Sequence, residues 1–175
     1  MKRACIAAIA ATTIVSAASA DVFSADYDVT VNSGEMVNAS ISLPALDSID
    51  SIAMELATTW GGDFEITLTS PTGDVFELMF DDTAAGGSGN FDMGLVAESG
   101  LLDNVDTYTF VEAGGLDDFA DGFSGGGTYN ANAWASGGWD AGDWSLLIVD
   151  DAGGDDSSVG NVSIMYTIPA PGAIA

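Results

Sequence analysis

The chain contains almost no basic side chains. Lys and Arg together number two among its 175 residues, and histidine is absent. The two basic residues, Lys2 and Arg3, precede all 27 acidic residues. A chain of this charge is repelled by nucleic-acid phosphates and by anionic lipid headgroups, so neither nucleic acid nor an anionic membrane surface is expected as a partner. Its carboxylates have to be solvated, hydrogen-bonded or paired with metal cations.

The scarcity of reactive side chains excludes most enzyme chemistries. Cys5 is the only cysteine, and it lies close to Lys2 in a leader-like segment. Beyond that segment there is no Ser-His-Asp triad, Cys-His pair or Schiff-base lysine, and no imidazole or thiolate for zinc. The composition still allows a carboxylate pair of the glycosidase type, but such pairs arise by chance in so acidic a chain. We therefore expect a protein that is not an enzyme and has no disulfide.

Residues 1–20, MKRACIAAIAATTIVSAASA, have the three-part pattern of a secretory signal peptide. Lys2 and Arg3 form the charged start, Ile6–Val15 the apolar centre, and Ala18–Ala20 the small-residue cleavage site. The apolar run is too short for a membrane span. We predict cleavage after Ala20 and a protein that is secreted or held at the cell surface.

Short runs of alternating apolar and polar residues predict β-strands, and no segment has helical periodicity. The apolar content of 47% argues against disorder. Tight turns are expected at Asn32–Gly34, as a hairpin, and at Ser70–Gly73. Residues 144–149 are apolar on both faces, which predicts a strand covered on both sides. The predicted strands are residues 27–31, 37–43, 52–57, 64–69, 76–80, 108–112, 144–149 and 162–168.

Two blocks of sequence resemble a known family. The first, from Gly142 to Asp150, reads Gly-x-Trp-x-Leu-x-Ile-x-Asp and is followed by an acidic glycine-rich turn and an alternating strand. The second lies upstream, with Phe64 where the family has Leu, and with Thr58 and Thr59 where it often has His. The matching residues of this second block are Gly62, Asp63, Leu68, Ser70, Pro71, Gly73 and Leu78.

Together these blocks resemble the P domain, also called P/Homo B, which accompanies subtilisin-like proprotein convertases and secreted bacterial peptidases. The resemblance implies an all-β fold: an antiparallel β-sandwich, jelly-roll-like, of about eight or nine strands. It also implies that a serine-type endopeptidase accompanies the module. The catalytic domain of such a peptidase has no counterpart in this sequence.

Calcium is the expected cofactor, because it binds six to eight oxygen ligands and this chain is rich in carboxylates. Four aspartates crowd onto the connection after residue 149, two follow the fifth predicted strand, and one matches a family position. The other interpretations are a solvated acidic loop and, for the family position, an Asp that bonds its own backbone in a turn. The candidate metal ligands are Asp150, Asp151, Asp155, Asp156, Asp81, Asp82 and Asp63.

The four tryptophans are further candidates. Trp144 alternates with apolar residues and is expected in the core. Trp60, Trp134 and Trp139 lie in loop sequence, where they either plug an end of the core or stack on sugar rings.

The sequence therefore predicts a signal peptide at residues 1–20, a P-domain-like sandwich at 21–168 and a tail at 169–175. The tail's Pro-Ala-Pro-Gly weakly resembles the start of a PEP-CTERM sorting signal but lacks its apolar helix and Arg cluster. The predicted function is a non-catalytic, calcium-stabilised module that binds, stabilises or assembles, with an unknown protein or polysaccharide partner. The alternatives are a carbohydrate-binding or adhesive surface module and an accessory part of a secreted subtilisin-like protease system.

Overall fold

The structure is a computed structural model that describes residues 19–32, 34–58, 64–79, 105–115, 126–150 and 157–170. These residues form nine strands and no helix, which confirms the predicted all-β class and the strand number. The strands are β1 (Ser19–Val31), β2 (Met36–Leu43), β3 (Ser48–Thr58), β4 (Phe64–Thr69), β5 (Val75–Met79), β6 (Asp106–Val111), β7 (Gly127–Asn130), β8 (Gly142–Asp150) and β9 (Ser157–Ile168).

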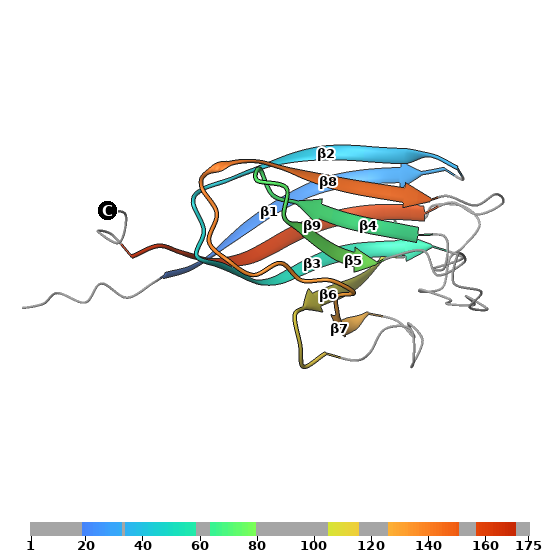
Figure 1. The fold of residues 1–175 in the computed structure, drawn as a ribbon. Coiled ribbons are helices and arrows are strands. Elements are labelled where there is room, and N and C mark those ends of the chain that lie inside the picture. The colour runs from blue at the N-terminus through green and yellow to red at the C-terminus, as the bar shows by residue number, and fades with distance from the viewer. Residues whose placement is uncertain are drawn as a thin grey trace, which may run out of the picture.

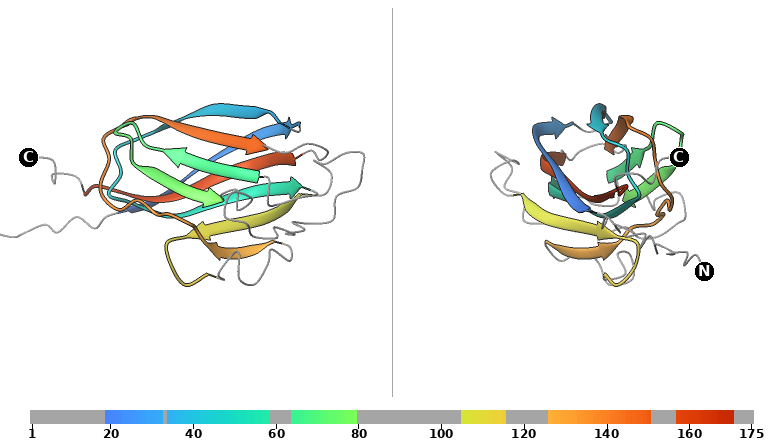
Figure 2. Two further views of the ribbon diagram at one scale, coloured as in Figure 1. Left: turned by 45° about the vertical axis from the view of Figure 1, so that its right-hand side comes forward. Right: turned by 90° about the vertical axis from the view of Figure 1, so that its left-hand side faces the viewer.

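The strands form two facing sheets, as predicted for a sandwich (Figures 1 and 2). One sheet has the order β1-β9-β3-β6-β7 and the other the order β2-β8-β4-β5. Every pairing is antiparallel except β6 with β7, which is parallel.

The pairing is nested in the manner of a jelly roll. With the short β7 set aside, the first strand pairs with the last, β2 with β8, β3 with β6, and β4 with β5. A chain folded this way behaves as one long hairpin wrapped into two sheets, so most partners are distant in sequence. The predicted jelly-roll arrangement is confirmed.

The predicted hairpin at Asn32–Gly34 is wrong. The chain does turn there, since the Glu35 N–H donates to the Asn32 carbonyl at 2.8 Å and Gly34 has a φ of +75°. However, β1 pairs with β9 and β2 with β8, so the turn carries the chain from one sheet to the other. Alternation on both sides of a turn does not distinguish a hairpin from a crossing between sheets.

β4 and β5 form a hairpin around the predicted turn at Ser70–Gly73. The Gly73 N–H donates to the Ser70 carbonyl at 3.0 Å, and Gly73 has a φ of +94°, which favours glycine. The sequence did not predict β7, which has only four residues and is held by parallel pairing with β6.

β8 is an interior strand, with β2 and β4 on its two sides, but only one of its faces is fully covered. Leu147 and Val149 are half-buried on the outer face, so the expectation of a strand covered on both sides is wrong. β9 belongs to the other sheet, and the acidic connection after β8 therefore joins two sheets. Residues 151–156 of that connection lie outside the described residues.

The core lies between the sheets and is built from the inward positions of both. It contains the predicted residues Trp144, Leu146, Ile148, Ile164, Tyr166, Ile66 and Leu68. Phe64 was predicted to join them, but its side chain lies outside the described part of the structure. Among the described residues, no helix is long and apolar enough to cross a membrane.

Candidate functional site

Three connections meet at one end of the sandwich, at the left of Figure 1. They are the β2–β3 connection, the β4–β5 turn and the segment that precedes β8. Their contact is fixed by a two-way backbone bridge, in which Leu46 and Trp139 each donate an N–H to the other's carbonyl at 2.8 Å.

Asp74 is the hydrogen-bonded centre of the β4–β5 turn. Its Oδ2 accepts from the Thr72 hydroxyl at 2.7 Å, from the Trp139 indole N–H at 2.9 Å and from the Ser70 hydroxyl at 3.2 Å. Bonds from Thr72, Trp139 and Ser70, in that order, hold the pKa of the Asp74 carboxyl below its usual range, because they stabilise the ionised form. Asp74 thereby ties the turn to the segment before β8.

The Trp139 side chain fills this end of the core. Only 6% of its surface is exposed, and its ring centroid lies 5.5 Å from that of Phe76 and 5.3 Å from that of Trp144. The loop tryptophans were expected either to plug an end of the core or to stack on sugar rings, and Trp139 plugs the core. Trp60 lies outside the described residues.

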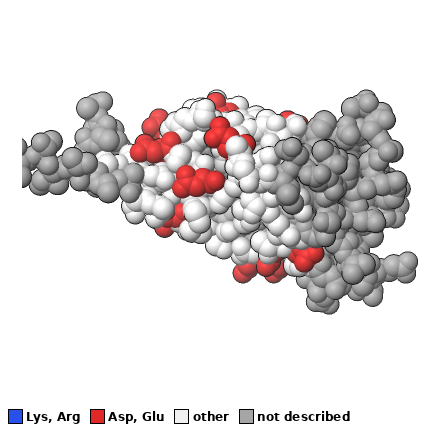
Figure 3. Space-filling view, turned by 90° about the horizontal axis from the view of Figure 1, so that it is seen from below, with Lys and Arg blue, Asp and Glu red and all other residues white. Residues whose placement is uncertain are grey.

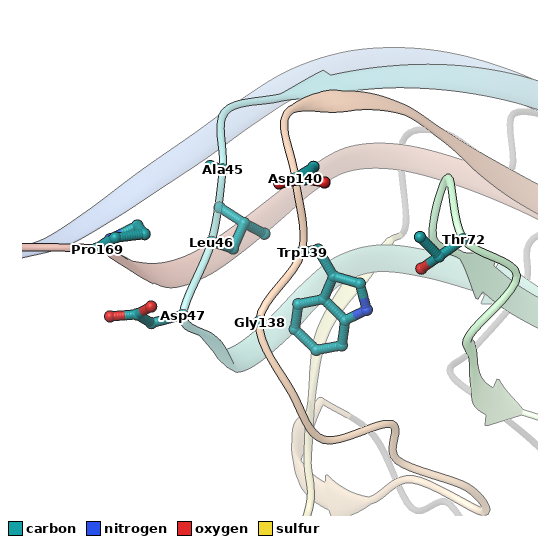
Figure 4. A pocket seen from close by; sticks show the side chains of 8 residues that line it. All are labelled: Ala45, Leu46, Asp47, Thr72, Gly138, Trp139, Asp140 and Pro169. Carbon is teal, nitrogen blue, oxygen red and sulfur yellow. The ribbon is translucent and has the colours of Figure 1, made fainter. Parts of the chain in front are cut away.

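A hollow of about 280 Å³ lies beside Trp139 (Figure 4). Asp47 and Asp140 carry its two carboxylates, and Leu46 and Pro169 contribute apolar surface. Figure 4 shows that the indole of Trp139 projects toward Thr72. Its N–H is already used in the hydrogen bond to Asp74 of the β4–β5 turn.

A larger hollow, of about 400 Å³, lies where β3 begins and β6 ends. Its lining includes two acidic residues, Asp50 and Glu112, and one aromatic residue, Trp134. Trp134 is half-buried and meets Phe76 edge-on, with ring centroids 4.9 Å apart and planes at 83°. Of the two loop tryptophans among the described residues, Trp134 is the less buried.

Of the predicted metal ligands, the structure describes only Asp150. Asp150 is 1% exposed, and its Oδ2 accepts from the Ser157 hydroxyl at 2.8 Å, which joins the end of β8 to the start of β9. Within the described ranges, no group of three or more acidic, histidine or cysteine side chains could hold a metal. The other candidates, Asp63, Asp81, Asp82, Asp151, Asp155 and Asp156, lie outside those ranges.

The remaining acidic side chains are spread over the surface. Figure 3 shows them singly or in small groups across one face of the sandwich. The sequence interpretation did not single out Asp50, Asp74 or Glu112, because nothing local distinguishes them among 27 acidic residues.

No family model matches the chain, and no curated protein matches it. The solved structures that are similar to it include the following two. The serine protease of Aeromonas sobria has a TM-score of 0.42 and 10% identity, and the match covers 86% of this chain and 27% of that one. The same protease in complex with its chaperone, ORF2, has a TM-score of 0.41 and 11% identity, with 85% and 27% covered. The chain thus spans about a quarter of the length of the structures it matches.

Asp74 gives a testable pH dependence. Because its pKa is lowered on folding, ionised Asp74 stabilises the fold above its ordinary pKa of 3.8, and this contribution is lost as the pH falls through the lower folded value. We expect Asp74→Asn to be less stable than wild type near pH 6, with the difference shrinking below about pH 4. Urea midpoints across this range measure it.

The matched control is Asp143→Asn, which removes one charge from an exposed position on β8. This variant corrects for the relief of general repulsion in so acidic a chain. A difference between wild type and Asp74→Asn that stays constant down to about pH 2 would contradict the assignment.

Proposed function

We propose that the chain is a non-catalytic, secreted P-domain-like module that binds, stabilises or assembles partner proteins. The observation that carries the proposal is the pairing of β4 with β8, in which Ile66 lies opposite Ile148 and Leu68 opposite Leu146. This pairing brings together the two sequence blocks that resemble the P domain, although more than sixty residues separate them. The Trp139–Asp74 hydrogen bond joins the upstream block to the segment just before Gly142, where the other block begins.

The resemblance also suggests the kind of partner. A secreted subtilisin-like serine endopeptidase is the expected neighbour of a P-domain-like module. The titratable groups among the residues that line the two hollows are carboxylates. The Ser48 hydroxyl donates to the Asp50 carboxylate, but neither hollow is lined by the imidazole, thiol or amine that most nucleophilic mechanisms use, which supports a role without catalysis.

The direct test is an assay of the purified chain on peptide, ester and glycoside substrates. We expect no hydrolysis, since the chain has no histidine and its only cysteine and lysine lie in the predicted leader. A subtilisin-like protease assayed in parallel controls for the substrates. Turnover by the purified chain that disappears when one Ser or Asp is replaced would contradict the proposal.

Calcium binding forms part of this proposal. Asp150 ends β8, Ser157 begins β9, and Asp151, Asp155 and Asp156 lie on the connection between them. These are oxygen donors, the kind that calcium prefers, and a divalent ion would offset the mutual repulsion of several carboxylates. Asp81, Asp82 and Asp63 are the alternative ligands.

We expect calcium to stabilise the fold by about 2.7 kcal/mol at a hundredfold excess over its Kd. Thermal melting with calcium, with chelator and with sodium chloride at matched ionic strength measures the effect. An Asp150→Asn/Asp155→Asn double variant should lose it, and the amide oxygen that replaces the Asp150 carboxylate can still accept from the Ser157 hydroxyl.

Two results would change the assignment. A calcium-dependent rise in Tm that persists in the double variant would move the ion elsewhere, with Asp81 and Asp82 tested next. A rise no larger than that with sodium chloride would leave the acidic connection as a solvated surface.

A further inference from the structure

We propose that the hollow formed by Asp50, Glu112 and Trp134, here called the acidic hollow, binds an Arg or Lys side chain of a partner protein. At about 400 Å³ it is large enough to receive one such side chain. Its other lining residues are Ser48, Ile49, Val111 and Ala113. The inference goes beyond the proposed function, because it names the chemistry of recognition and requires neither calcium nor a protease.

Asp50 is held in place before any ligand arrives. The register of β3 against β9 shifts between Ile49 and Ser51, so Asp50 is the extra residue of a bulge. Bulges are a common means of redirecting one side chain out of a regular ladder. The Ser48 hydroxyl then donates to Asp50 Oδ1 at 3.0 Å, and the Thr167 hydroxyl donates to Oδ2 at 3.3 Å. A carboxylate fixed in this way loses little conformational entropy on binding.

Trp134 is also positioned by its own contact. Its edge-on packing against the fully buried Phe76 fixes the ring, while its half-buried state leaves part of it on the acidic hollow. Tryptophan is the side chain that attracts cations most strongly through its ring face. A guanidinium or ammonium group in the acidic hollow would therefore lie among one aromatic and two acidic residues of its lining.

The hydrogen-bonding capacity of the acidic hollow favours a cation over a sugar. Carboxylates only accept, and the hydroxyl proton of Ser48 is already donated to Asp50. Apart from the Trp134 indole N–H, the lining side chains offer acceptors or no polar atom at all. A sugar hydroxyl both donates and accepts, whereas Arg and Lys only donate.

The negative charge of the acidic hollow also favours a cationic occupant. Asp50 and Glu112 place two like charges in one hollow, and the sequence has no basic residue after Arg3 that could neutralise them. The strongly acidic surface draws cationic groups toward the molecule, and the acidic hollow offers them a defined place to bind. The occupant is therefore expected to come from another chain.

The test uses the full chain with Lys2→Gln and Arg3→Gln, which removes its own basic side chains as competitors. The isotope-labelled protein, dialysed against chelator, is titrated with a capped Gly-Gly-Arg-Gly-Gly peptide at about 150 mM salt, where the Debye length is about 8 Å. We expect the indole N–H signal of Trp134, assigned with Trp134→Phe, to shift and saturate. The same peptide with citrulline, an uncharged analogue of arginine, should leave that signal in place.

Matched variants separate the acidic hollow from general attraction. Asp50→Asn/Glu112→Gln should weaken binding at least about fivefold, while Asp106→Asn/Asp143→Asn, with the same loss of charge at exposed positions, should change it less than about twofold. Equal weakening by both double variants, equal binding of the citrulline peptide, or no shift of Trp134 would each overturn the proposal. A Trp134 shift with an oligosaccharide and not with the arginine peptide would replace it with sugar binding.

Discussion

Replacing Trp144 with alanine is expected to lower the free energy of unfolding by about 3–5 kcal/mol, the range for removing a large buried aromatic side chain. Trp144 is 1% exposed, lies opposite Ile41 in the β2–β8 pairing, and packs against the rings of Phe76 and Trp139. Alanine would leave a cavity beneath the centre of a four-stranded sheet, where neighbouring side chains cannot easily collapse. Urea denaturation followed by circular dichroism measures the loss.

Trp144→Phe is the matched variant. The indole Nε1 of Trp144 is buried and has no hydrogen-bond partner in the described part of the protein. Phenylalanine removes this unsatisfied donor and keeps an aromatic ring, so we expect a markedly smaller loss than with alanine. An unchanged urea midpoint for Trp144→Ala would mean that the side chain contributes nothing to the core.

The local pattern of the sequence predicted the strands well because burial in a sandwich follows a period of two. In β3, for example, Ile52, Met54 and Leu56 are fully buried at alternating positions. Strand pairing was predicted less well, since the nested topology joins partners that are far apart, such as β1 and β9. The residues around Asn32 contain no local signal that β1 pairs with β9, near the end of the sequence.

The candidate site shows the same division between local and distant information. The sequence identified the Ser70–Gly73 turn and the loop tryptophans, but not that Trp139 donates to Asp74 across the end of the sandwich. Asp50 acquires its orientation from a bulge and from Thr167, more than a hundred residues away. In a chain with so many acids, position in the fold distinguishes one carboxylate from another, whereas residue type does not.

The second large expected effect is that of Phe76→Ala, which should also destabilise the fold by about 3–5 kcal/mol. Phe76 is fully buried, lies opposite Leu68 in the β4–β5 hairpin, and contacts the rings of Trp134, Trp139 and Trp144. Its loss would remove the common neighbour of the three tryptophans. Urea denaturation measures the stability, and near-ultraviolet circular dichroism reports the packing of the indole rings.

Phe76→Leu separates the stability of the core from the positioning of Trp134. Leucine keeps most of the apolar volume, so we expect only the loss of aromatic pairing, about 0.5–1.5 kcal/mol for each pair, and a fold that stays intact. Trp134 would lose the edge-on contact that holds its ring at the acidic hollow. We therefore expect Phe76→Leu to weaken binding of the arginine peptide in a folded protein. Unchanged peptide binding in this variant would show that Phe76 does not position Trp134, because the ring would then keep its place without its aromatic neighbour.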